Sequence, residues 1–215
     1  MAEKKDIAAI LADGPVIPVI VIDDVAHAVP MARALVEGGV RVLEITLRTD
    51  AGLESMRRII AEVPDAIVGA GTVLTPAQLE EVAAIGAAFA VSPGATPRLL
   101  DAAAQSPVPL LPGTSTASEV MTLLERGYSH MKLFPAEAVG GANLLASLAS
   151  PLPGATFCPT GGIDPEKAKR YLALPNVVCV GGSWLVPRDA MRQGEWGKLT
   201  ELARGTAALR KEGSR

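Results

Sequence analysis

One lysine, Lys132, lies within the apolar segment HMKLFP at residues 130–135, a pattern otherwise typical of a buried strand. Lysine is seldom fully buried unless a partner compensates its charge. Three interpretations are open: an ion pair, a stem that reaches the surface, or a reactive amine. A lysine in water titrates near ~10.4, so about one molecule in 10³ carries the free amine at neutral pH, and burial favours that form. An uncharged amine can attack a ketone and form a Schiff base, which makes Lys132 the first candidate for covalent chemistry.

A second polar group lies in the segment RVLEITLRT, which begins at residue 41. Successive side chains of a strand alternate between two faces, so Glu44, Thr46 and Arg48 share one face and the apolar residues between them share the other. The apolar face suits packing against helices, which leaves the polar trio facing inward. Glu44 and Arg48 could form a structural ion pair, but a buried ion pair is a weak source of stability. We therefore interpret Glu44, Thr46 and Arg48 as part of a functional site.

Two pairs of glycines follow two later apolar segments, in PTGGID and VGGSWL. Gly161, Gly162 and Gly182 let backbone amides approach an anion closely, and Ser183 can donate one more hydrogen bond. Either pair alone could form only a tight turn. Because the pairs follow neighbouring segments, we interpret them together as a phosphate site.

Further candidate residues lie near the ends of other apolar segments. The alternation along the lysine-bearing segment directs Phe134 inward. Thr72, Pro93 and Thr160 lie where predicted strands end. His27, by contrast, lies on a predicted helix and is expected to pack or to face solvent.

The elements that must position these side chains alternate regularly. Short β-branched segments are followed by longer segments with helical spacing, and no linker interrupts them. Strand then helix, eight times over, predicts an α/β fold: a single-domain (β/α)8 TIM barrel over residues 1–215, with an N-terminal lead-in helix at about residues 5–13. Active sites of that fold lie at the carboxyl ends of the strands. A doubly wound open sheet is the alternative, but no G-x-G-x-x-G follows the first strand. The predicted strands are residues 15–22, 41–48, 66–73, 88–94, 108–113, 130–135, 156–162 and 177–186. Thr75 and Asp164 are predicted N-caps, each followed by proline at the first helical position, and the segment WGKLTELARGTAALRKEG predicts a closing helix.

Composition excludes several classes of function. The 215 residues are 49% hydrophobic and 20% charged, with a formal charge of −3 and 3% aromatic residues, which argues against nucleic-acid binding. Cys158 and Cys179 have no metal-ligand spacing and are interpreted as core cysteines of a reducing compartment. We see no secretory signal and no apolar run long enough to span a membrane, so we expect a soluble, cytoplasmic protein without a membrane partner.

With these residues assembled, the sequence resembles the 2-keto-3-deoxy-6-phosphogluconate (KDPG) aldolase / 4-hydroxy-2-oxoglutarate aldolase family of class I aldolases. The resemblance covers nearly all of the chain up to about residue 187. It is carried by the segments GPVIPVIVID, RVLEITLRT, IVGAGTV, FAVSPG, KLFPAEAVGG, FCPTGGI and VGGSWLV.

The resemblance implies a role for each candidate residue. It implies that Lys132 is the Schiff-base lysine, that Glu44 is the acid and base, and that Arg48 holds the substrate carboxylate. It also implies substrate contacts for Thr72, Pro93, Phe134 and Thr160, and phosphate contacts for Gly161, Gly162, Gly182 and Ser183.

The family's reaction is the cleavage of KDPG to pyruvate and D-glyceraldehyde 3-phosphate in the Entner–Doudoroff pathway. The resemblance implies this activity, activity on 4-hydroxy-2-oxoglutarate, and a homotrimer. No metal and no cofactor are expected, because a protonated imine is itself an electron sink. Two alternatives stay open. One is an aldolase for the galactonate-derived phosphosugar, although EITLRT favours the gluconate-derived substrate; the other is a phosphosugar-binding barrel in which Lys132 merely pairs with Glu44.

Overall fold

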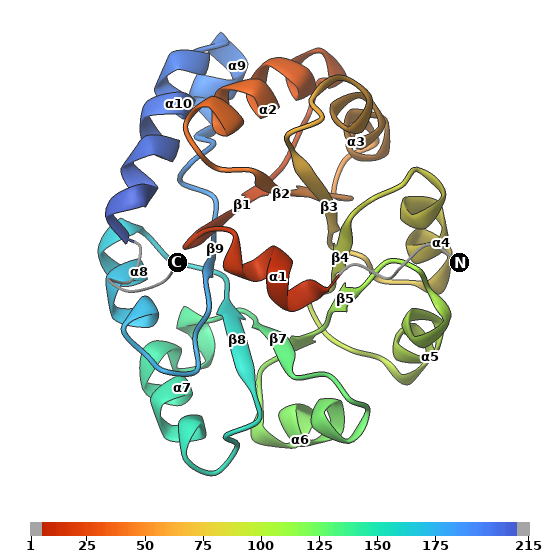
Figure 1. Cartoon of the computed structure of the whole chain (residues 1–215), viewed down its shortest axis with the longest axis vertical. Coiled ribbons are helices and arrows are strands. Elements are labelled where there is room, and N and C mark those ends of the chain that lie inside the picture. Colours follow the sequence, from red (N-terminus) through yellow and green to blue (C-terminus); the bar gives the residue numbers. More distant parts are fainter. Residues whose placement is uncertain (1–5, 210–215) are drawn as a thin grey trace.

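The computed structural model describes residues 6–209, in which strands and helices alternate along the chain. Figure 1 shows the strands arranged around a common centre with most helices outside them. The strands are β1 (Val16–Ile20), β2 (Val42–Thr46), β3 (Ile67–Gly71), β4 (Phe89–Val91), β5 (Leu110–Leu111), β6 (Gly113–Thr114), β7 (His130–Leu133), β8 (Thr156–Pro159) and β9 (Val180–Gly182). The α-helices are α1 (Ile7–Ala12), α2 (Ala28–Glu37), α3 (Ala51–Glu62), α4 (Pro76–Ala84), α5 (Pro97–Gln105), α6 (Ala117–Glu125), α7 (Gly141–Ala149), α8 (Pro165–Leu172), α9 (Arg188–Gln193) and α10 (Trp196–Gly205). Three short 3-10 helices complete the set: η1 (Val25–His27), η2 (Glu137–Val139) and η3 (Thr206–Leu209).

The strands form two parallel sheets. The first has six strands in the order β5-β4-β3-β2-β1-β9, and the second has three in the order β6-β7-β8. Isolated parallel bridges, Phe157 to Val177 and Thr160 to Gly181, connect the β8 segment with the β9 segment. Strands β1 to β5 follow one another in sequence order, so the sheet lacks the switch point of a doubly wound fold. The prediction of a parallel α/β fold is confirmed.

A single predicted strand, residues 108–113, is divided in the structure. Pro112 separates β5 from β6, since proline has no backbone amide to donate to a ladder. Its carbonyl still accepts a hydrogen bond from the Lys132 amide at 2.8 Å. β5 therefore pairs with β4, whereas β6 pairs with β7.

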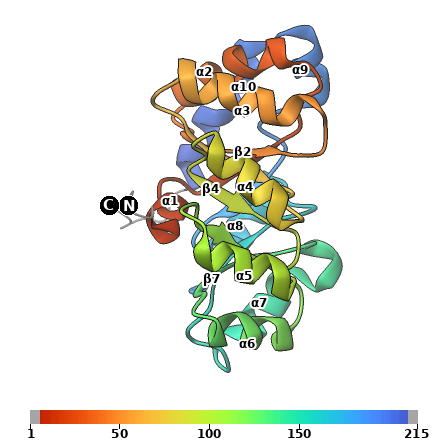
Figure 2. The ribbon, with the colours of Figure 1, turned by 90° about the vertical axis from the view of Figure 1, so that its right-hand side faces the viewer.

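The core has two parts, as the alternation of side chains requires. Outward-facing strand residues such as Leu43, Ile45 and Leu133 pack with the helices in the larger cluster. A smaller inner cluster joins Leu11 of α1 with strand residues that include Phe89. Figures 1 and 2 show α1 lying across one end of the strands. This helix therefore covers the amino end and leaves the carboxyl end for a site.

Helix boundaries follow the predicted caps. Thr75 and Asp164 each accept a hydrogen bond from the amide three residues on, with proline at the first helical position of α4 and α8. The predicted lead-in helix corresponds to α1 and the closing helix to α10 and η3; residue 5 and residues beyond 209 lie outside the described residues. α9 was not predicted.

Two further observations concern the core and the surface. Cys158 and Cys179 are buried free cysteines, as expected, and a hydrogen bond to Cys158 together with burial raises the pKa of the Cys179 thiol. Within residues 6–209, none of the helices combines the length and the apolar character that a membrane span requires.

Candidate active site

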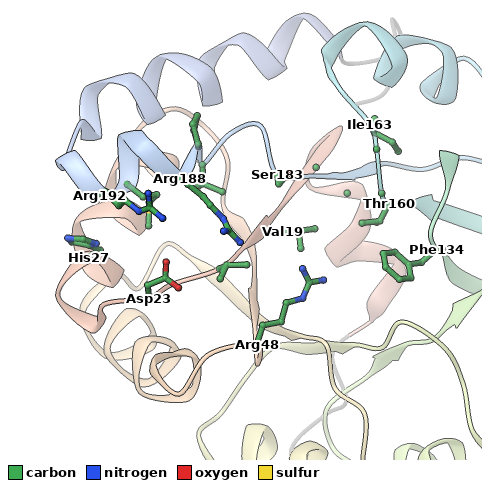
Figure 3. A pocket seen from close by; sticks show the side chains of 18 of the residues that line it. Val19, Asp23, His27, Arg48, Phe134, Thr160, Ile163, Ser183, Arg188 and Arg192 are labelled. Atoms are coloured by element: carbon green, nitrogen blue, oxygen red, sulfur yellow. The ribbon is translucent and has the colours of Figure 1, made fainter. Parts of the chain in front are cut away.

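A cavity of about 580 Å³ lies at the carboxyl ends of β1, β7, β8 and β9. Figure 3 shows Arg48 and Arg188 extending toward its middle, with Phe134 and Thr160 on the opposite wall. Seven of the predicted site residues line it, whereas Glu44, Thr72, Pro93 and Lys132 do not. The seven are Arg48, Phe134, Thr160, Gly161, Gly162, Gly182 and Ser183.

Lys132 and Glu44 meet beneath this cavity although they belong to different sheets. The amine Nζ of Lys132 donates to Oε1 of Glu44 at 3.1 Å, and both side chains are 4% exposed. The Phe134 ring lies beside them, with its centroid 5.5 Å from Nζ. In this buried pair, Glu44 is the group that can accept the ammonium proton. The ion-pair and reactive-amine interpretations of Lys132 are therefore compatible.

The position of Glu44 depends on a glycine in the neighbouring strand. A Cβ atom at Gly71 of β3 would collide with Glu44 Oε1. A larger residue at this place would displace the carboxylate from Lys132. In the segment GAGTV, Gly71 thus leaves room for the Glu44 carboxylate, and the next residue, Thr72, contacts Arg48.

Arg48 is held by that next residue, Thr72. The Arg48 Nε donates to the Thr72 hydroxyl at 3.0 Å, which leaves the terminal nitrogens of the guanidinium for a ligand in the cavity. Thr72 has a φ of +61°, an unusual conformation for a β-branched residue. Such strain is maintained where surrounding contacts require it, often at functional sites.

Two predicted strands end near buried hydroxyl groups that lack a hydrogen-bond partner within the described residues. The Thr160 hydroxyl, which belongs to the wall of the cavity, and the Ser92 hydroxyl are buried and have no hydrogen-bond partner within the described residues. A buried polar atom without a partner is rare and calls for an explanation. For Thr160 a ligand in the cavity would supply one. Pro93 lies farther back, where its carbonyl packs against Gly113.

The glycine-rich end of the cavity has the backbone that close approach to an anion requires. Gly161 and Gly162 have φ values of +111° and +75°, which side-chain-bearing residues rarely adopt. At Gly182 a Cβ atom would collide with the Trp184 ring. Ser183 is exposed at the mouth of the cavity.

The sequence-based predictions missed five charged or titratable residues that line the cavity: Asp23, Asp24, His27, Arg188 and Arg192. His27 was expected to pack or face solvent; it does pack, edge to face, against Trp196, but it also borders the cavity. Arg188 makes no ion pair within residues 6–209. No motif marked these residues as part of a site. Asp23 and Asp24 follow β1, His27 ends η1, and Arg188 and Arg192 belong to α9, which was not predicted.

The arrangement can bind a ligand with an anionic group at each end. Arg48 offers a planar cation at one end, the glycine loop and Ser183 offer hydrogen-bond donors at the other, and the lysine–glutamate pair lies beneath. Among residues 6–209, no cluster of three or more His, Cys, Asp or Glu side chains could hold a metal ion.

Comparison with known proteins identifies close relatives. The family model for KDPG and KHG aldolases matches residues 7–202. The KHG/KDPG aldolase of Escherichia coli strain K12 is 55% identical over 201 residues, which cover 94% of each chain.

Solved structures agree with this comparison. The KDPG aldolase of Legionella pneumophila, with pyruvate captured at low pH as a covalent carbinolamine intermediate, is 47% identical with a TM-score of 0.93, covering 94% of this chain and 98% of that one. The aldolase of Zymomonas mobilis ZM4 that acts on 2-keto-3-deoxy-6-phosphogluconate, solved with 3-phosphoglycerate, is 45% identical with a TM-score of 0.90, covering 97% and 98%.

Proposed function

The chain belongs to the KDPG and KHG aldolase family, and from this membership we propose that it cleaves KDPG to pyruvate and D-glyceraldehyde 3-phosphate. We propose cleavage of 4-hydroxy-2-oxoglutarate as a second activity, because both substrates share the pyruvyl half. The observation that carries the proposal is the buried contact between the Lys132 amine and the Glu44 carboxylate below a cavity with two anion-binding ends.

The proposed reaction begins when Glu44 takes a proton from Lys132 and leaves a neutral amine. The amine attacks the C2 ketone, and the proton held by Glu44 passes to the carbinolamine hydroxyl, which leaves as water and gives a protonated imine. Glu44, once more ionised, accepts the C4 hydroxyl proton directly or through water, and the C3–C4 bond breaks as its electrons move into the imine. The aldehyde leaves, the enamine is protonated at C3, and water releases pyruvate from Lys132. Glu44 thus serves first as base and then as acid.

Two anchors hold the bond that breaks. Arg48 would bind the pyruvyl carboxylate with its terminal nitrogens, in the bidentate geometry that guanidinium favours. The amides of the glycine loop and the Ser183 hydroxyl would bind phosphate at the other end, where Arg188 adds positive charge. Thr72 would orient Arg48, whereas Phe134, Thr160 and Pro93 would shape the space between the anchors. Fixing both ends lowers the entropic part of the barrier.

The role of Arg48 is tested by replacement with lysine. Loss of the bidentate contact is expected to lower kcat/KM by about 10- to 100-fold, chiefly through KM, as expected when a hydrogen bond to a charged group is lost. The effect should be similar for both substrates, because each carries the pyruvyl carboxylate. Steady-state kinetics measures it, with Arg57→Lys on the exposed face of α3 as the matched control. An unchanged KM would remove Arg48 from the proposed role.

Covalent trapping tests the proposed function most directly. Borohydride added with pyruvate is expected to reduce the imine and leave a stable adduct on Lys132, which intact mass and peptide mapping detect. Unmodified protein that still binds the phosphorylated sugar acid would favour the alternative, a phosphosugar-binding barrel without aldolase chemistry. Turnover on the galactonate-derived phosphosugar beside KDPG decides the remaining substrate alternative.

The proposal extends to the whole molecule. We propose that both sheets belong to one closed (β/α)8 barrel and one domain over residues 1–215. The bridges from β8 to the β9 segment, the single residue between β5 and β6, and the contact of Lys132 with Glu44 support closure. A homotrimer remains a prediction from the family resemblance, and a cytoplasmic location remains one from the sequence.

A further inference from the structure

The glycine loop between β8 and α8 has a second side, where Lys167 lies. The Lys167 Nζ donates to the carbonyl of Gly162 at 2.8 Å and contacts Glu137 Oε2 at 3.1 Å. Its backbone amide donates to the side chain of Asp164, the N-cap of α8. Lys167 and Glu137 border a separate cavity of about 220 Å³, so they approach the loop from outside the candidate active site.

These contacts fix the direction of the loop's amides. The Glu137 backbone amide donates to the carbonyl of Gly161 at 3.2 Å, and Lys167 holds the next carbonyl, that of Gly162. In a planar trans peptide the carbonyl and the following amide point in opposite directions. The amides of Gly162 and Ile163 therefore point away from Glu137 and Lys167. Gly162 and Ile163 both line the 580 Å³ cavity, and neither of their backbone amides donates a hydrogen bond within the described part of the chain.

Glu137 is itself held in place. The Tyr171 hydroxyl donates to its Oε1, and this bond together with Lys167 holds the pKa of the Glu137 carboxyl below its usual value, so the carboxylate is ionised at neutral pH. The side chain also packs closely against the loop: a Cβ at Gly162 would lie 3.0 Å from Glu137 Cγ. The loop thus has little room to turn its peptides toward α8 while Glu137 and Lys167 remain paired.

We propose that Lys167, anchored by Glu137, is a positioning residue that orients the loop amides toward the phosphate group and so sets the preference for phosphorylated over unphosphorylated substrates. This inference rests on the proposed function. Lys167 touches neither substrate; it acts by holding the Gly162 carbonyl, which keeps two backbone donors directed at the anion. Its influence should therefore appear only with a substrate that carries phosphate.

Lys167→Met removes the donor but retains an apolar stem of similar length. For this variant we expect KM for KDPG to rise about tenfold, the effect of weakening hydrogen bonds to a charged group. On 4-hydroxy-2-oxoglutarate, which has no phosphate, KM should change little. The preference for KDPG, taken as the ratio of the two kcat/KM values, is the measured quantity. Lys167→Arg, which can donate to the same carbonyl, should recover part of that preference.

Lys169→Met is the matched control. Lys169 lies two residues along α8, pairs with Glu166 at the surface and does not touch the loop, so its replacement should leave the preference unchanged. Should Lys167→Met fail to fold by circular dichroism, Glu137→Gln serves in its place, because it weakens the anchor while an oxygen acceptor for Tyr171 remains.

An equal loss on both substrates, or no change in the preference, would overturn the positioning role. These outcomes differ from a failure of the proposed function. In that case the unaltered protein would form no adduct with pyruvate and borohydride and would cleave neither substrate.

Discussion

Replacing Lys132 with alanine or arginine is expected to lower turnover of KDPG by roughly 10⁴-fold or more, in line with the loss of a nucleophile in other enzymes. Neither variant can form an imine, since alanine has no amine and guanidinium stays protonated. A coupled assay that reduces the released pyruvate with NADH measures the effect. Borohydride trapping should give no adduct in either variant.

The two variants separate chemistry from stability. Lys132→Ala leaves the Glu44 carboxylate buried without its partner, and breaking a buried ion pair in this way costs about 3–5 kcal/mol. Lys132→Arg keeps a positive charge opposite Glu44, so thermal denaturation should show a smaller loss of stability. Turnover close to that of the unaltered protein in either variant would end the assignment of Lys132 as nucleophile.

Glu44→Gln is expected to lower kcat by about 10²- to 10⁴-fold, the usual contribution of a general acid–base. An amide of the same shape cannot accept the C4 hydroxyl proton or later deliver one to the enamine. Imine formation should survive at a lower rate, because the Lys132 amine is retained and water can take its proton in place of Glu44. A mass adduct on Lys132 after pyruvate and borohydride, together with slow turnover, is the expected pair of results.

Glu62→Gln, on the exposed surface of α3, is the matched control for this change and should be indistinguishable from the unaltered protein. Full turnover in Glu44→Gln would contradict the role of Glu44. Loss of trapping in a folded Glu44→Gln variant would instead show that water cannot replace Glu44 in taking the proton from Lys132.

Strand alternation allowed much of the candidate site to be predicted. It placed Glu44 and Lys132 on inward faces although they are 88 residues apart, and the structure brings their side chains into contact. Local rules also predicted the caps of α4 and α8, because a cap depends on only four or five consecutive residues. Both kinds of prediction depend only on residues that are close together in the sequence.

Features that depend on tertiary contacts were not predictable in this way. The positive φ of Thr72 arises from its surroundings, and nothing in the letters GAGTV requires it. Arg188 lines the cavity from the first residue of α9, which was not predicted, and Lys167 contacts the glycine loop through a backbone carbonyl, a group that every residue has. The division of one predicted strand at Pro112 was overlooked although proline is a local signal.

α1 covers the amino end of the strands, and the candidate active-site cavity lies at their carboxyl end. In the proposed reaction, pyruvate is tethered to Lys132 in the interior, whereas the phosphate end lies by exposed Ser183 at the entrance. The triose must then depart before pyruvate can, and during synthesis pyruvate must arrive first. The position of the cavity and the covalent link to Lys132 would therefore impose the same order of substrate binding and product release.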